Sequence, residues 1–345
     1  MSIAACARGQ AAPDGPDGNR QPLAAAETTP LDRIRIWRPG KPADPGPVAF
    51  KPLSDFTGSD SIKLSNGIEV DLADWRSVSR SATGENCTST LIGPRTILTA
   101  AHCVDAGKRP GQSDQERGGS MSIAGDDFQL TCVMHDKYKA LAPAAEGGVR
   151  GTRDYALCDL GRVVDFNVVE AESINIVNPI PGGTSILLTG YGCTAVEITR
   201  FGKLTYKRSD GKLRMGDERL DGIDQNSGSE PQGIWSATRT VIAISPGPPV
   251  PGAKPAPEPI LCPGDSGGPV MTGATVRNQA AKRKVVAVNS ALGWERTGTS
   301  WTIYSYVAPL ATPDFRAFIQ QYVVDRPGLV ICGYNQIGGL GGCRV

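Results

Sequence analysis

The sequence predicts an all-β protein, built as a barrel or a sandwich, with one helix near its C-terminal end. Three observations support this fold class. From residue 84 onward, short β-rich segments alternate with Gly, Pro and Asn turns. Residues 313–323 form the one segment with a clear helical pattern. Residues 1–60 differ from both, because they carry nine of the 27 prolines and too little apolar surface to repay ordering.

The strands are expected where β-branched and aromatic residues cluster between turn residues. Four such runs are TSILLTGYG (184–192), TRTVIAIS (238–245), RKVVAVNSA (283–291) and WTIYSYVAP (301–309). The helix begins at Pro313 and places Phe315, Phe318, Ile319 and Tyr322 on one face, so it is expected to pack on the β core. The polar stretch 203–233 and the proline-rich stretch 246–259 are predicted to be long surface loops.

Composition limits the class of function. The 345 residues suffice for one large domain or two ordinary ones, and a formal net charge of +1 gives no basic surface for nucleic acid. No apolar run reaches 18 residues, so no transmembrane segment is expected. None of the nine cysteines forms a CxxC pair and only two histidines are present, so disulfides in an oxidising compartment are expected and no metal or cofactor is. We therefore predict a secreted or periplasmic protein. Cys6 in IAAC is either a lipid-acylated cysteine or a spare thiol.

The stretch CPGDSGGP, residues 262–269, surrounds Ser266 with three glycines. Alone it fits a surface turn better than a catalytic loop, but glycines also let two N–H groups approach a developing oxyanion. A nucleophilic serine needs a neutral base. The histidines are His102, in LTAAHC, and His135, in VMHDKY. A Cys87–Cys103 disulfide would hold the turn that carries His102, with a stabilisation of about 3 kcal/mol.

Through LTAAHC, DYAL and CPGDSGGP, in this order, residues 64–325 resemble the trypsin and chymotrypsin family of serine endopeptidases, in particular its secreted bacterial members. The resemblance implies two antiparallel six-stranded Greek-key β-barrels followed by the helix. It assigns His102 as general base, Asp154 as the carboxylate that orients it and Ser266 as nucleophile. The N–H groups of Gly264 and Ser266 form the oxyanion hole. Asp159 and Asp165 lie near Asp154 in the sequence, and His135 is expected to be structural.

The resemblance also indicates substrate-binding residues. Ile260 occupies the floor of the pocket for the side chain before the cut bond, which favours apolar or small side chains over Arg or Lys. The edge strand that pairs with the substrate backbone is formed by Asn289, Ser290 and Ala291. Thr302 stands where many relatives carry glycine and is expected to narrow the pocket.

Relatives are made as zymogens, and this implies an activation site. Cleavage after Lys63 would release the Leu64 amine to pair with Asp265, although relatives usually begin with Ile or Val. Lys63 is otherwise an exposed linker lysine. The remaining cysteines are expected to form three further disulfides, which are Cys132–Cys158, Cys193–Cys262 and Cys332–Cys343.

The predicted organisation has four parts. Residues 1–63 are a disordered leader or pro-segment, 64–178 the first barrel, 179–325 the second barrel with the helix, and 326–345 a glycine-rich tail. The predicted function is a serine endopeptidase that acts on protein or peptide substrates through an acyl-enzyme and is activated by another protease. The alternatives are a catalytically silent binding protein on the same fold and an esterase. Chain order disfavours the esterase, because both histidines precede Ser266.

Overall fold

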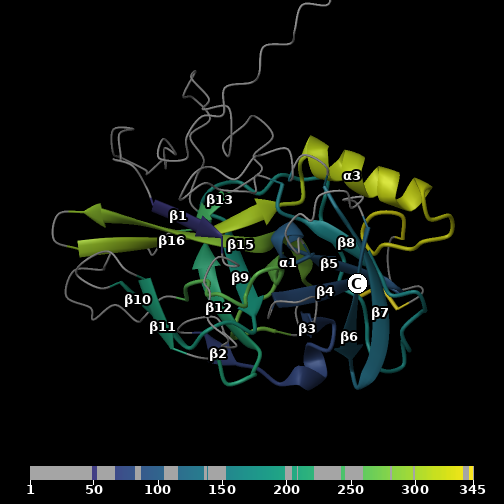
Figure 1. Ribbon diagram of the computed structural model, residues 1–345, viewed down its shortest axis with the longest axis horizontal. Helices are drawn as coiled ribbons and strands as arrows, with labels where there is room; N and C mark the ends of the chain where they lie inside the picture. Colours follow the sequence, from purple (N-terminus) through teal and green to yellow (C-terminus); the bar gives the residue numbers. More distant parts are fainter. Residues whose placement is uncertain are drawn as a thin grey trace, which may run out of the picture.

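The computed structural model describes residues 49–52, 67–81, 87–104, 116–135, 138, 153–198, 204–207, 209–220, 242–244, 259–279, 282–297, 300–336 and 342–344. Two antiparallel sheets lie side by side, and a C-terminal helix lies over one of them (Figure 1). The first sheet is built from β3 (Val78–Ser81), β4 (Cys87–Gly93), β5 (Thr96–Thr99), β6 (Glu116–Ile123), β7 (Asp126–Met134) and β8 (Ala156–Asp159). The second combines β1 (Ala49–Pro52), β2 (Ile68–Glu69), β9 (Ser185–Gly190), β12 (Arg214–Arg219), β13 (Ile242–Ile244), β14 (Pro269–Thr272), β15 (Lys284–Thr297) and β16 (Ser300–Pro309).

The six-stranded sheet has the order β3-β4-β5-β8-β7-β6. Its two end strands, β3 and β6, also contact each other, so the sheet curls back on itself like a barrel. The strands β4, β5 and β8 are buried along their whole described length, while β7 alternates buried and exposed residues. This alternation is what one solvated face requires.

The second sheet has the order β13-β16-β15-β14-β9-β12-β2, and β1 pairs with β15 off this path. Six of its eight strands come from residues 185–309. The all-β prediction is confirmed, and among the described residues the first sheet has the six strands expected, whereas the second sheet has eight. Two strands from the N-terminal region join this sheet, because β2 pairs with β12 and β1 pairs with β15. The leader prediction therefore differs at Ala49–Pro52, which form a strand.

The polar stretch 203–233 was predicted to be a loop, and this is wrong for its first half. Residues 204–207 form β11, which pairs with β10 (Ala195–Ile198), and β12 pairs with β9. The loop prediction failed here because the apolar residues Leu213 and Met215, which are buried, alternate with charged residues in the sequence. A strand in which only one face is apolar reads as a polar segment.

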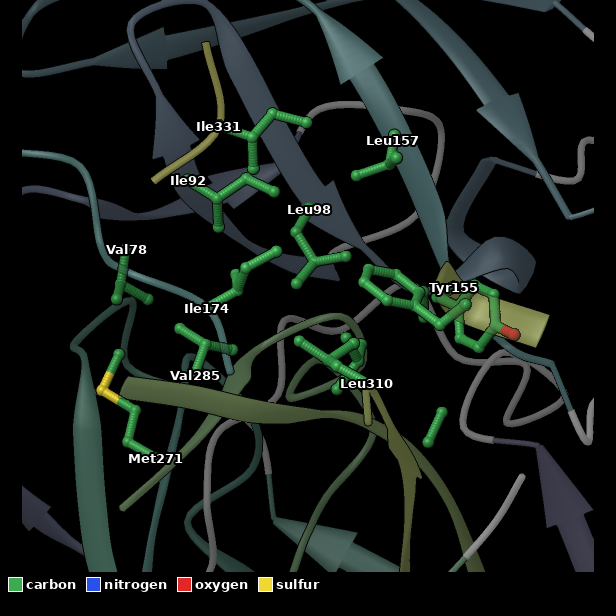
Figure 2. Close-up of a cluster of buried hydrophobic side chains, with 14 of the residues drawn as sticks. Val78, Ile92, Leu98, Tyr155, Leu157, Ile174, Met271, Val285, Leu310 and Ile331 are labelled. Atoms are coloured by element: carbon green, nitrogen blue, oxygen red, sulfur yellow. The ribbon is translucent and has the colours of Figure 1, made fainter. Parts of the chain in front are cut away.

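The largest hydrophobic cluster joins the two sheets (Figure 2). Ile92, Leu98 and Leu157 enter it from the first sheet, and Met271 and Val285 from the second. Since all five are at most 1% exposed, the two halves share one core instead of forming independent units.

Helix α3 (Pro313–Val324) confirms the predicted helix and its packing. Thr312 caps its N-terminus by accepting a hydrogen bond from Phe315 N, and Pro313 occupies the first turn. Phe315 packs edge-on against Tyr155, which precedes β8, with 4.8 Å between ring centroids. Among the described residues, no helix is long and apolar enough to cross a membrane.

The C-terminal tail is part of the fold. Cys332 N donates to Ile92 O at 2.8 Å, and Ala171 N donates to Gly342 O at 2.7 Å. The Cys332–Cys343 disulfide joins these two anchoring points, and Ile331 belongs to the shared core. The tail therefore ties β4 to the connection between the two sheets.

A buried ion pair fixes the same connection. The Glu172 carboxylate accepts from Arg283 Nη2 at 2.6 Å and Nε at 3.0 Å and from Ser77 Oγ at 2.6 Å. Both side chains of the pair are fully buried, and the Arg283 guanidinium stacks on Trp75, with Cζ 3.6 Å from the ring centroid. The pair joins segments on either side of the shared core.

Breaking this pair should destabilise the fold strongly. We expect Arg283→Met to lower the free energy of unfolding by about 3–5 kcal/mol, because the buried Glu172 charge would lose its nearest cation and keep, among the described residues, only Arg344, with Nε 3.7 Å away. Lys212→Ala is the matched control, since Lys212 and Glu69 form an exposed pair worth at most about 1 kcal/mol. Urea denaturation of both variants measures the difference, and equal midpoints would contradict this role.

Candidate functional site

Asp154 and His102 form the centre of the candidate site. His102 belongs to the short helix α1 (Ala101–Val104), which directly follows β5. The Asp154 Oδ2 atom lies 2.6 Å from His102 Nδ1, and Oδ1 accepts from His102 N at 2.9 Å. Because a carboxylate only accepts hydrogen bonds, Nδ1 carries a proton, and in the neutral imidazole Nε2 then has the lone pair. This is the arrangement that a general base needs.

Ser290 donates a third hydrogen bond to the same carboxylate. Its Oγ lies 2.6 Å from Asp154 Oδ2, and both residues are buried. Sequence reasoning placed Ser290 only on the substrate edge, and no local motif connects residues 136 positions apart. The contact links β15 of the second sheet to the segment that precedes β8 of the first.

The turn that carries His102 is fixed by a disulfide. Cys103 bonds to Cys87 at the start of β4, as predicted. One atom each of Cys87, His102 and Cys103 lie within 4.8 Å of one another. Since the disulfide uses both sulfurs, this group offers no thiolates to a metal.

Ser266 lies where two tight turns meet. In the first, Asp265 N donates to Cys262 O at 2.9 Å, with Gly264 at φ +98°. In the second, Gly268 N donates to Asp265 O at 2.9 Å, with Gly267 at φ +79°. A glycine with positive φ in the third position is the mark of a type II turn, for which Pro263 in the second position is well suited. Gly264 and Gly267 of CPGDSGGP are therefore required by backbone conformation.

The Ser266 loop is anchored to both sheets. Thr88 N, in β4, donates to Ser266 O at 2.7 Å, and Gly267 N donates to Asn289 O, in β15, at 2.9 Å. A Cβ atom on Gly267 would overlap Thr99 Oγ1 and Thr88 O. The serine loop thus lies against the strand that leads into His102 and against the strand that carries Ser290.

Asp265 is completely buried beneath this loop. Its Oδ1 accepts from Gly192 N at 2.7 Å, and its Oδ2 accepts from Cys262 N at 2.8 Å. A Cβ at Gly190 or Gly192 would overlap the carboxyl group, which explains both glycines of the GYG segment. The predicted partners in activation, Lys63 and Leu64, lie outside the described residues, and so does Cys6.

The predicted substrate residues fall into two groups. Asn289, Ser290 and Ala291 lie consecutively on β15, directly beside the Ser266 loop, and half-buried Ile260 packs against the core of the second sheet. Leu261 N, next to it, donates to Ser305 Oγ of β16. Thr302 is paired with Glu295, four positions beyond Ala291 along β15. The structure therefore does not bring Thr302 opposite Ala291.

The remaining predictions concern the other cysteines and His135. All three further disulfides are formed, as Cys132–Cys158, Cys193–Cys262 and Cys332–Cys343. The second of these ties the serine loop to the segment after β9. His135 lies at 5.4 Å from the ring centroids of both Tyr155 and Phe318, in agreement with a structural role. Asp159, the nearest alternative to Asp154, instead pairs with Arg95, and Asp165 accepts a hydrogen bond from Asn167 N.

Comparisons with known proteins agree with this geometry. The fold and the site define a chain with the architecture of a serine protease of the two-barrel class. Residues 66–214 match the family model Trypsin. The chain is 26% identical to mouse (Mus musculus) Serine protease 23 over 202 residues, which cover 53% of this chain and 46% of that protein, so it spans about half the relative's length. Over residues 66–214 the chain is therefore similar to the trypsin family of serine proteases.

A solved structure similar to this chain is neuropsin, a serine protease expressed in the limbic system of mouse brain. The TM-score is 0.48 and the sequence identity 16%, over 74% of this chain and 98% of that chain.

Tyr191 supports the Asp265 loop and is sensitive to pH. Its hydroxyl donates to Val78 O at 3.1 Å, and its N–H donates to Thr88 Oγ1 at 3.1 Å. Burial raises the pKa of Tyr191 to about 12, because the phenolate would lose its hydration. The neutral side chain therefore favours the folded state.

The pH dependence of stability follows from this shift. The contribution of Tyr191 is fully present below the ordinary tyrosine pKa of about 10 and is lost as pH rises toward the folded value of about 12. Each pKa unit corresponds to about 1.4 kcal/mol. We expect the free energy of unfolding to fall more steeply between pH 10 and pH 12 in the wild type than in Tyr191→Phe. Urea denaturation across this range measures both slopes, and equal slopes would refute the assignment.

Proposed function

We propose that this protein is a serine endopeptidase in which His102, Asp154 and Ser266 form the catalytic triad. The observation that carries the proposal is the buried Asp154 carboxylate, which holds His102 at both its backbone N and its ring Nδ1. The imidazole is thereby kept with Nε2 available to take a proton. Ser266 O accepts a hydrogen bond from Thr88 N. Thr88 directly follows Cys87, which forms a disulfide with Cys103, the neighbour of His102.

In this mechanism Ser266 Oγ attacks the carbonyl carbon of the scissile peptide bond while His102 takes its proton. His102 then gives the proton to the leaving amine, and water cleaves the acyl-enzyme ester by the same route. The N–H groups of Gly264 and Ser266 would stabilise the oxyanion. The positive φ of Gly264 supports this role, since a type II turn fixes the orientation of the Pro263–Gly264 peptide.

The activation proposal concerns Asp265. Cleavage after Lys63 would free the Leu64 amine to join the Asp265 carboxylate, which is already oriented by Gly192 N and Cys262 N. The four disulfides of the described residues favour an oxidising compartment, and therefore a secreted protein. A silent binding protein remains the alternative function, and the following experiment separates the two.

Ser266→Ala should lower the rate of peptide hydrolysis by about a millionfold, as in other serine proteases whose nucleophile is removed. A serine-directed fluorophosphonate, applied before and after limited proteolysis, gives a direct readout when the labelled residue and the new amino terminus are located by mass spectrometry. We expect a label on Ser266 after release of Leu64 and none in Ser266→Ala.

Two other outcomes are informative. Full labelling of the uncut chain would contradict the zymogen proposal but support the nucleophile. The absence of label at Ser266 in both forms would favour the silent binding protein.

The proposed specificity follows from Ile260. Burying an arginine side chain against an apolar floor would leave its charge unpaired and cost several kcal/mol. Peptides that differ only in the residue before the cut bond should give kcat/KM at least about tenfold higher for Leu or Ala than for Arg, since tenfold corresponds to 1.4 kcal/mol. Ile260→Asp should reverse this order. A preference for Arg in the wild type would overturn the assignment of Ile260.

A further inference from the structure

One edge of β15 carries three structures in succession. β14 pairs with it from Lys284 to Val288. The Ser266 loop follows, since Gly267 N donates to Asn289 O and Asn289 N donates to Gly268 O, both at 2.9 Å. β1 then pairs with Ala291–Trp294. Ser290, which donates to Asp154, lies between the serine loop and β1.

The leader strand β1 runs antiparallel to β15 beside the site. Ala49 pairs with Trp294, and Pro52 pairs with Ala291, so the strand approaches Ser290 as its residue numbers rise. Figure 1 shows β1 lying along the β15–β16 hairpin. An extended peptide that bound this edge by backbone hydrogen bonds would need the same row of N–H and C=O groups.

The other edge of β15 is taken by β16 over residues 287–297. A peptide substrate that reaches Ser266 along β15 therefore has only the edge that β1 uses. Since backbone hydrogen bonds are saturated by one strand, β1 and a substrate cannot both pair with Ala291–Trp294.

We propose that Ala49–Pro52 act as an intramolecular, substrate-like strand that closes the substrate edge until the leader is detached. This rests on the proposed protease function. β1 precedes Lys63 in the sequence, so the cut proposed there would leave β1 held only by noncovalent contacts. One cleavage would then both release the Leu64 amine and open the edge.

The tether determines the size of the effect. A segment linked to its own binding edge acts at an effective concentration on the order of millimolar. It competes well with peptide substrates at lower concentration while attached, and it is diluted away once the chain is cut. The competition should raise KM and leave kcat nearly unchanged, because β1 contacts the edge and not the reacting atoms.

The test uses the full chain with Phe50→Pro and Lys51→Pro combined, which removes two N–H donors from β1. The matched control is Ala24→Pro with Ala25→Pro, which adds two prolines upstream of β1. In a Ser266→Ala background, where no self-cleavage occurs, we expect hydrogen exchange in the peptide Ala291–Trp294 to accelerate at least about tenfold in the β1 variant. The control should match the parent.

The second part of the experiment uses protein that retains Ser266, together with a short peptide substrate. Before leader cleavage the comparison uses the low residual activity of the uncut chain, in which the Leu64 amine is not yet free. We expect the β1 variant to have a residual kcat/KM about tenfold above that of the control, mainly through KM, and the two proteins to be equal after cleavage. Equal exchange and equal kcat/KM in a protein that labels at Ser266 would overturn this inference and leave the protease function standing. Faster exchange without any label at Ser266 would support the placement of β1 and contradict the protease function.

Discussion

The structure depends on one carboxylate that has been removed from water. Asp154 is 2% exposed, and a buried carboxylate is costly unless donors replace its hydration. Three donors do so here, and they come from the backbone of His102, its ring, and Ser290. His102 lies beside the first sheet and Ser290 belongs to the second, so the Asp154 charge is fully stabilised only when both sheets are assembled. The hydrogen bonds that stabilise the buried Asp154 charge are therefore the same ones that orient the His102 imidazole.

The backbone around Ser266 meets a second constraint. Two turns in succession need two glycines at positive φ, and the glycines at 190, 192 and 267 face atoms that leave no room for a Cβ. The glycine content of this region is a packing requirement as much as a functional one. A side chain at any of these positions would have to move Asp265, Thr88 or Thr99, which belong to the frame of the site.

Much of the site could be predicted because its information is local. The motif around Ser266, the turn around His102 and the helix from Pro313 each carry their signal within about ten residues, and the four disulfides follow from the spacing of the cysteines and the family resemblance. Strand pairing is not local. β2 and β12 were missed as partners because Ile68–Glu69 are exposed and because Leu213 and Met215 are hidden among charged residues. β1 was missed because it lies in a proline-rich region with few apolar residues. Its strand conformation depends on pairing with β15, which the local sequence does not indicate.

The tail carries a consequence for how the polypeptide is made. Ile331 and Cys332 complete the packing around Ile92, and Arg344 N donates to Ala171 O, so the first sheet lacks part of its own core without residues 331–344. During synthesis the amino-terminal half emerges long before these residues leave the ribosome. The first sheet therefore cannot complete its core by itself and stays incompletely packed until residues 331–344 have been synthesised and can pack against it.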